Sequence, residues 1–245
     1  HLRCELPHHT TLPLFEKLVG REPVSLVSLM DHSPGQRQFA NIEKYREYYQ
    51  GKYSLSDAEM ARYEEEQLAL AAQWSQPNRL SIAAMCRDRN IALASHDDAT
   101  HDHVRESHQL GSVIAEFPTT FEAAEASRKH GMNVLMGAPN IVRGGSHSGN
   151  VAASKLASLG LLDILSSDYY PASLLDAAFR VADDEGNSFT LPQAIRLVTK
   201  NPASALNLHD RGEIAEGKRA DLVLAHRKGE HVHIDHVWRQ GKRVF

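Results

Sequence analysis

Six short apolar runs, separated by stretches of helical character, constrain the fold of this 245-residue chain more than any other feature. The runs are continuous rather than alternating, which is typical of strands buried on both faces of a parallel sheet. They cover residues 2–4, 24–30, 91–95, 112–117, 133–136 and 162–166. Helices are expected at 121–129, 151–159, 174–182 and 191–199. This order predicts an α/β domain.

Two regions depart from that alternation. Residues 40–90 contain no evident strand, and Ser56 with Glu59 three positions later has the form of a capping box. We therefore predict a helical insertion over 40–90, with a charged helix running from Ser56 to about residue 74. After residue 206 the sequence is rich in turns, with short strands expected at 222–225, 233–238 and 241–245. The predicted domains are an α/β domain over 1–206 and a small β-module over 207–245.

Composition excludes several classes of protein. The formal net charge is −4 and no block of Lys or Arg stands out, so no nucleic-acid partner is expected. No apolar run approaches the roughly 20 residues of a membrane span, so no membrane partner is expected. The two cysteines, Cys4 and Cys86, are too few for a disulfide framework, and a cytoplasmic location follows as the default. The chain opens with His1 in what already reads as a strand, which suggests a fragment of a longer protein.

Four polar residues follow the ends of predicted strands, where parallel α/β folds build their sites. They are Glu5, His32, His96 and Asp168. Each has a simpler interpretation alone: a salt-bridged surface acid, a turn residue and two helix caps. Because all four occupy equivalent positions, we predict that two imidazoles and two carboxylates form a divalent-metal site.

A glycine-rich segment after the predicted strand 133–136 is the second candidate site. It carries possible donors to an anion at Asn140, Arg143, Ser146, His147 and Ser148. Glycines let backbone N–H groups approach a ligand, the following helix N-terminus favours an anion, and Arg suits a phosphate. We predict that these residues bind a polyphosphate, and the alternative is a flexible surface loop.

These motifs resemble those of one enzyme family. Segments 201–206, 212–214 and 217–223 resemble the closing segment of amidohydrolase-superfamily enzymes, which leads from the last barrel helix into a small β-sandwich. Segments 30–36, 95–100, 116–120, 136–140, 146–150 and 166–171 resemble one branch of that superfamily. That branch hydrolyses a ribose triphosphate in phosphonate catabolism.

The resemblance implies a (β/α)8 TIM-type barrel, here partial, with a small C-terminal β-sandwich segment. It implies one or two divalent metal ions, which are zinc, manganese or iron, and a phosphorylated ribose phosphonate as the small-molecule substrate. The reaction would convert α-D-ribose 1-methylphosphonate 5-triphosphate to the 5-phosphate plus diphosphate. Glu5 would be the bridging carboxylate, and Asp168 would be both a metal ligand and the general base. A homodimer is compatible with this reading.

The sequence also departs from the family pattern. No His-x-His pair follows a first strand, so we expect the first barrel strands and two metal ligands to lie upstream of His1. Two alternatives stay open. One is an amidohydrolase acting on a C–N bond, because residues 31–35 also resemble adenine deaminases. The other is an inactive fragment or a binding component.

Overall fold

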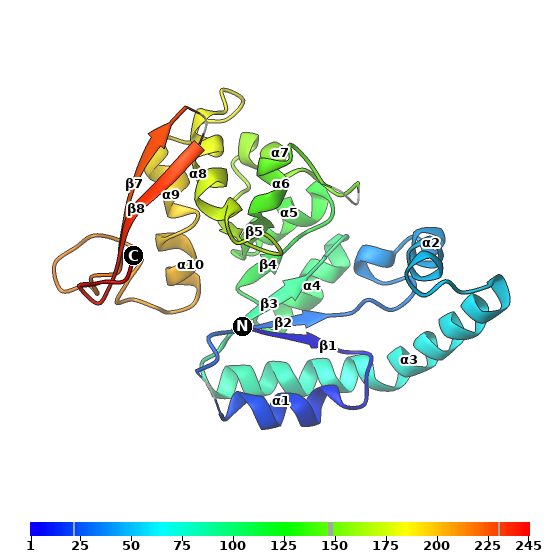
Figure 1. Ribbon diagram of the computed structural model, residues 1–245. Coiled ribbons are helices and arrows are strands. Elements are labelled where there is room, and N and C mark those ends of the chain that lie inside the picture. Colours follow the sequence, from blue (N-terminus) through cyan, green and yellow to red (C-terminus); the bar gives the residue numbers. More distant parts are fainter. Residues whose placement is uncertain (22, 147–148, 230) are drawn as a thin grey trace. The chain divides into compact units, whose positions relative to one another are not determined.

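The computed structural model describes residues 1–21, 23–146, 149–229 and 231–245 (Figure 1). The chain divides into two compact units, His1–Met132 and Asn133–Phe245. This division differs from the boundary expected after residue 206, and that boundary stays a prediction.

The first unit is built on four parallel strands. In order across the sheet they are β1 (Leu2–Glu5), β2 (Leu26–Met30), β3 (Ala92–His96) and β4 (Ile114–Glu116). The register pairs Glu5 with Met30 and His96 with Glu116, so the carboxyl ends of the strands meet at one edge of the sheet. The predicted α/β class with parallel strands is confirmed.

Apolar side chains from these strands pack against two helices. Val27 and Leu93 form a buried cluster with Phe15 of α1 (Thr11–Val19) and with Ile82 of α3 (Asp57–Asp88). Figure 1 shows α1 beside the C-terminal half of α3, under β1. Burial of this cluster holds α1 and α3 against the sheet, and it therefore fixes the position of the strand ends relative to these helices.

Residues 40–90 form two α-helices, α2 (Ile42–Tyr53) and α3, after the short 3₁₀ helix η1 (Arg37–Phe39). The predicted capping box of Ser56 and Glu59 begins α3. The expected end near residue 74 is wrong, because α3 continues through Pro77 to Asp88. Proline has no amide hydrogen to donate, and α3 changes direction along its length (Figure 1). Burial of the C-terminal half of α3 in the core outweighs this loss.

An aromatic cluster holds α2 to the start of α3. Phe39, Tyr45 and Met60 are buried together, and Tyr49 and Tyr63 pack against them. The rings of Phe39 and Tyr45 meet edge to face, with centroids 5.2 Å apart. Aromatic pairs of this geometry add about 0.5–1.5 kcal/mol to the burial of their area. The cluster therefore gives α2 and the start of α3 a small core of their own.

Two further helices complete the first unit. They are α4 (His101–Gln109) and α5 (Phe121–Lys129). Thr100 and Thr120 cap their N-termini, each accepting a backbone N–H at its hydroxyl. The prediction of a helix over 121–129 is confirmed.

The second unit begins with a pair of parallel strands, β5 (Asn133–Gly137) and β6 (Ile164–Ser166). Its helices are α6 (Ala138–Val142), α7 (Ala153–Ser158), α8 (Ser173–Asp183), α9 (Leu191–Arg196) and α10 (Lys200–Ala205). Helices were expected at the positions of α7, α8 and α9, and α7 and α9 are shorter than expected. Segment 138–142, expected to be part of a glycine-rich loop, is helical, because Pro139 lies in its first turn, where a missing N–H costs nothing.

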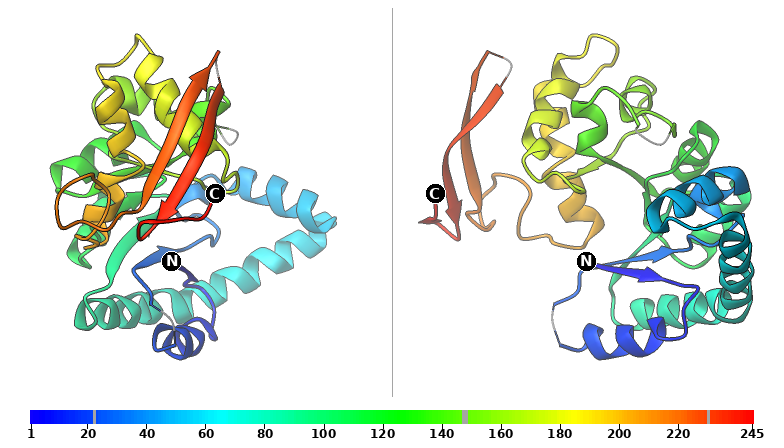
Figure 2. Two further views of the ribbon diagram at one scale, coloured as in Figure 1. Left: turned by 60° about the vertical axis from the view of Figure 1, so that its left-hand side comes forward. Right: turned by 45° about the vertical axis from the view of Figure 1, so that its right-hand side comes forward.

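The chain ends in a three-stranded antiparallel sheet of β7 (Leu222–Lys228), β8 (His231–Arg239) and β9 (Lys242–Arg243). Figure 2 shows β7 and β8 as an extended hairpin. The predicted C-terminal β segment is confirmed. Among the described residues, none of the helices combines the length and apolar character needed to cross a bilayer.

Candidate metal centre

Three of the four predicted metal ligands lie at the carboxyl edge of the first unit's sheet. Glu5 ends β1, His32 lies two residues beyond β2, and His96 ends β3. Because neighbouring strands are parallel and in register there, their ends place these side chains side by side. The first unit thus brings Glu5, His32 and His96 together.

Two histidines turn the same ring atom toward one carboxylate. Nε2 of His32 lies 3.5 Å from Oδ2 of Asp97, and Nε2 of His96 lies 3.3 Å from it. One ligand atom from each of His32, His96 and Asp97 lies within 4.8 Å of the other two. Two imidazole nitrogens and one carboxylate oxygen are a donor set that zinc and other divalent transition metals accept.

Carboxylates fix the other ring nitrogen of both histidines. Oε2 of Glu5 accepts a hydrogen bond from Nδ1 of His32 at 2.6 Å, and Oε1 of Glu5 accepts from the His32 backbone N–H at 3.0 Å. Oε2 of Glu116 accepts from Nδ1 of His96 at 2.7 Å. A histidine whose Nδ1–H is held by a carboxylate presents Nε2 to a metal, and such partners orient the ring. These residues therefore fit a divalent metal.

The charges around His32 favour a cation. Burial alone would lower the pKa of His32, but hydrogen bonds to Asp97 and Glu5 prevail and raise it to about 9. Burial would likewise raise the pKa of Glu5, yet its hydrogen bonds to His32 lower it. Arg3 approaches from the side, with Nη2 3.2 Å from Nε2 of His96, and must give way before that nitrogen can bind a metal. The site stabilises positive charge between Glu5 and Asp97.

Asp97 and Glu116 were not among the predicted ligands. Asp97 follows β3 directly and has a positive φ of 55°, and Thr100, rather than His96, caps α4. Glu116 is the last residue of β4. The signal that selected His96, a polar residue after a predicted strand, applies equally to Asp97. Glu116 lies inside the expected strand 112–117, so that signal does not select it.

The predicted phosphate-binding residues lie in the second unit. Oδ1 of Asn140, in α6, accepts a hydrogen bond from the Ala153 backbone N–H at 2.9 Å and so holds the start of α7. Arg143 is exposed and donates from Nη1 to the hydroxyl of Tyr169 at 2.9 Å. Ser146 is half-buried. His147 and Ser148 lie outside the described residues. The grouping of these residues around a phosphate stays a prediction.

Asp168 follows β6 in the second unit. It has a positive φ of 47°, and its side chain lies against the end of β5. A Cβ added at Gly137 would lie 3.3 Å from Oδ2 of Asp168. Gly137 therefore makes room for this carboxylate, whose role as fourth ligand and base stays a prediction.

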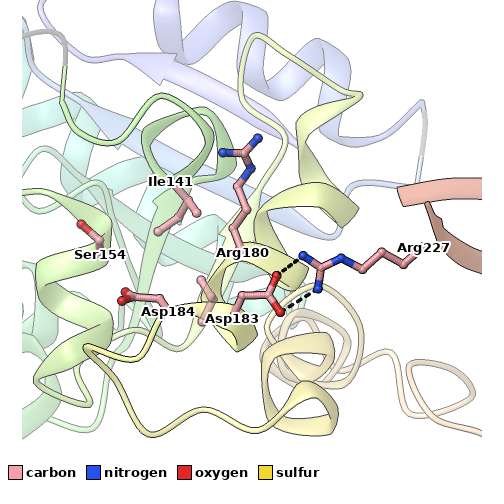
Figure 3. Close-up of a pocket in the computed structure, with 7 residues that line it drawn as sticks. Ile141, Ser154, Arg180, Asp183, Asp184 and Arg227 are labelled. Carbon is pink, nitrogen blue, oxygen red and sulfur yellow. Dashed lines mark hydrogen bonds and ion pairs between the residues drawn. The ribbon is translucent and has the colours of Figure 1, made fainter. Parts of the chain in front are cut away.

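A separate hollow of about 420 Å³ lies in the second unit. Figure 3 shows Arg180 and Asp183 of α8 in its wall, with Asp183 paired to Arg227 of β7 at 2.6 Å. Ile141, Ser154, Val181 and Asp184 complete the described lining. This lining includes none of the predicted site residues.

Comparison with known proteins assigns the family. Residues 30–245 match the amidohydrolase family, so the chain belongs to that family. It is 89% identical over all 245 residues to the α-D-ribose 1-methylphosphonate 5-triphosphate diphosphatase of Escherichia coli (strain K12). The chain spans 65% of the length of that relative. The predicted family resemblance is confirmed.

Two more distant similarities accompany these. An adenine deaminase of Ligilactobacillus salivarius (strain UCC118) is 34% identical over 125 residues, which are 47% of this chain and 21% of that protein. The crystal structure of an uncharacterised protein superposes with a TM-score of 0.51 at 19% identity, over 68% of this chain and 48% of the other. The second similarity concerns the fold alone.

Proposed function

We propose that the complete protein containing this chain hydrolyses α-D-ribose 1-methylphosphonate 5-triphosphate to the 5-phosphate and diphosphate. The observation that carries the proposal is the 89% identity, over the whole chain, to the E. coli diphosphatase. The donor set of His32, His96 and Asp97 supports it, because phosphoryl hydrolysis benefits from a divalent cation. The substrate is therefore a small phosphorylated ribose phosphonate, with no nucleic acid or membrane as a partner.

Each proposed role follows from the chemistry of the residue. His32, His96 and Asp97 would hold one or two divalent ions, which are zinc, manganese or iron, and Glu5 and Asp168 stay the further predicted ligands. When bound, such an ion lowers the pKa of a water and polarises a phosphoryl oxygen. Glu5 keeps His32 in the tautomer that ligates.

The remaining roles belong to residues of the second unit. Asp168 accepts the proton of the attacking water as general base, a role that rests on its position after β6 and on the family resemblance. Asn140, Arg143, Ser146, His147 and Ser148 bind the triphosphate, where a guanidinium offers a bidentate contact to phosphate.

The test is release of diphosphate by the complete protein and its Asp168→Asn variant. We expect turnover to fall by at least about 100-fold, because the amide cannot take up a proton. Asp102→Asn, which changes an exposed carboxylate of α4, is the matched control and should retain full turnover. Wild-type turnover in Asp168→Asn, with an unchanged circular dichroism spectrum, would remove Asp168 from the mechanism.

A second candidate function is hydrolysis of a C–N bond. The specific observation in its favour is the 34% identity to an adenine deaminase over 125 residues, a match that covers 47% of the chain. Ammonia release from adenine by the metal-loaded protein, without diphosphate release from the ribose triphosphate, would favour this function over the first.

We also propose that the protein works in the cytoplasm. Cys4 and Cys86 are both buried free thiols, as expected of a protein in a reducing compartment. A homodimer stays a prediction, which sedimentation of the complete protein tests.

A further inference from the structure

Two consecutive residues of α3, Asn78 and Arg79, contact the loops that carry the candidate metal ligands. Both are buried, with 2% and 7% of their surfaces exposed. They lie directly after Pro77, where α3 enters the core of the first unit. Polar side chains this deeply buried are costly unless they are hydrogen-bonded, and both residues are bonded to segments next to the strand ends.

Asn78 fixes the turn after Glu5. Its Nδ2 donates to the backbone carbonyl of Leu6 at 2.8 Å and to that of His8 at 2.9 Å. Both amide hydrogens are therefore used on the segment that immediately follows the carboxylate holding His32. A change at Asn78 would remove one of two donors from each carbonyl, leaving only the His8 backbone N–H on Leu6 and the Thr11 backbone N–H on His8.

Arg79 fixes the segment before His32. Its Nη2 donates to Oδ2 of Asp31 at 3.2 Å, and its Nη1 lies 2.6 Å from Oε1 of Glu106 in α4. Asp31 is 4% exposed and also accepts hydrogen bonds from the backbone and hydroxyl of Ser33. The guanidinium thus holds the loop on both sides of His32, since Asp31 precedes this histidine and Ser33 follows it.

The same network of charged side chains extends through Glu106 to the neighbour of Asp97 in the sequence. The second carboxylate oxygen of Glu106 accepts from Nη2 of Arg37 at 3.0 Å, and Arg37 is ion-paired with Asp98. Asp98 is 1% exposed and is the neighbour of Asp97 in sequence. Removing Arg79 leaves the buried carboxylate of Asp31 without its cationic partner, so the surrounding groups must move.

We propose that Asn78 and Arg79 are positioning residues of the metal centre, acting through the loops after β1, β2 and β3. The inference rests on the proposed metal site and deepens it. Neither residue touches the metal or the substrate. Asn78 sets the place of Glu5, and Arg79 sets the place of His32 directly and that of Asp97 through Glu106, Arg37 and Asp98.

The test measures the Kd for Zn²⁺ in the complete protein, by titration against a chelating indicator. Arg79→Met and Asn78→Ala should each weaken binding by about 10- to 100-fold, the effect typical of groups that orient metal ligands. Arg79→Lys keeps the charge but reaches only one of the two carboxylates, so its Kd should lie between those of Arg79→Met and the wild type.

Two matched controls separate positioning from general damage to the helices. Ser75→Ala removes a buried hydroxyl of the same helix that has no hydrogen-bond partner among the described residues. Arg46→Met breaks an ion pair between α2 and the first half of α3, with Glu64 as the partner. Both controls should keep the wild-type Kd. Thermal denaturation of each metal-free variant reports the stability independently.

Two outcomes overturn the inference in distinguishable ways. If Arg79→Met and Asn78→Ala lower the Tm but keep the wild-type Kd, while His96→Ala loses Zn²⁺, the metal site stands and the positioning role falls. If His96→Ala also keeps the wild-type Kd, the proposed metal site itself falls, and the positioning role with it. Should Arg79→Met not fold, Arg79→Lys and Asn78→Ala decide between these outcomes.

Discussion

Glu116 offers a direct measure of how strongly the surrounding carboxylates tune the metal centre. Its Oε2 lies 2.7 Å from Nδ1 of His96, and both residues are 4% exposed. Glu116→Gln preserves the shape of the side chain and replaces a charged acceptor by a neutral amide. The substitution therefore weakens the hold on the His96 ring with little change in packing.

The size of the effect follows from burial. Hydrogen bonds to a charged group are roughly twice as strong as neutral ones, and here water cannot replace the lost acceptor. Loss of the group that orients a histidine ligand costs about 10- to 100-fold in metal affinity, or about 1.4–2.8 kcal/mol. Because the pair is almost fully buried, we expect a value in the upper half of that range.

The assay is a Zn²⁺ titration of Glu116→Gln against a competing chelator at constant pH. Glu125→Gln is the matched control, since Glu125 forms an exposed ion pair with Lys129 on α5 at 2.8 Å. A wild-type Kd in Glu116→Gln, with unchanged near-ultraviolet circular dichroism, would refute the reasoning. The same Kd change in both variants would mean that net charge, and not the hydrogen bond to His96, sets the affinity.

Three further predictions test other parts of the structure. Ile82→Ala, at a fully buried core position of α3, should lower the free energy of unfolding by about 2–5 kcal/mol in urea denaturation, and a loss below 1 kcal/mol would contradict the packing described. Burial raises the pKa of Cys4 to about 12 and that of Cys86 to about 11, so neither thiol should react with a disulfide reagent at pH 8 until urea unfolds the protein. Because unfolding returns both thiols toward the ordinary pKa of 9.0, their contribution to stability is present below pH 9, and it declines as the pH rises toward 11 for Cys86 and toward 12 for Cys4. Gly137→Ala should displace the side chain of Asp168 and lower kcat more than KM in the diphosphatase assay, and an unchanged kcat would separate this contact from catalysis.

The sequence predicts the sheet better than the helices around it. Continuous apolar runs marked the strands β2 to β6, because a strand buried on both faces has no other pattern available. The strand β1 was also placed correctly, although Arg3 is exposed and only Cys4 is buried. The end of α3 was placed near residue 74, but the helix continues through Pro77, a residue that usually ends a helix, to Asp88. Only tertiary burial of the residues that follow Pro77, such as Ile82, carries the helix onward.

The candidate site was predictable where its residues follow strands. Glu5, His32 and His96 were found by position alone, and the same rule would have selected Asp97, while Glu116 falls inside the expected strand 112–117. Asn78 and Arg79 could not have been found in this way, because they lie in the middle of a long helix and do not follow any strand in the sequence. Their contacts with Leu6 and Asp31 depend on how α3 packs, which local sequence does not encode.

The two halves of α3 should tolerate changes of length very differently. The part of α3 before Pro77 extends to the aromatic cluster that it shares with α2. Because each residue adds about 1.5 Å to a helix, whole turns can be added or deleted there without rotating the rest of the helix. A single residue inserted between Pro77 and Asn78 would rotate Asn78, Arg79 and Ile82 by about 100° around the helix axis, so that each side chain would lose its present contacts. Natural relatives of this chain should accordingly vary in length between residues 42 and 76 and keep a constant spacing from residue 78 to β3.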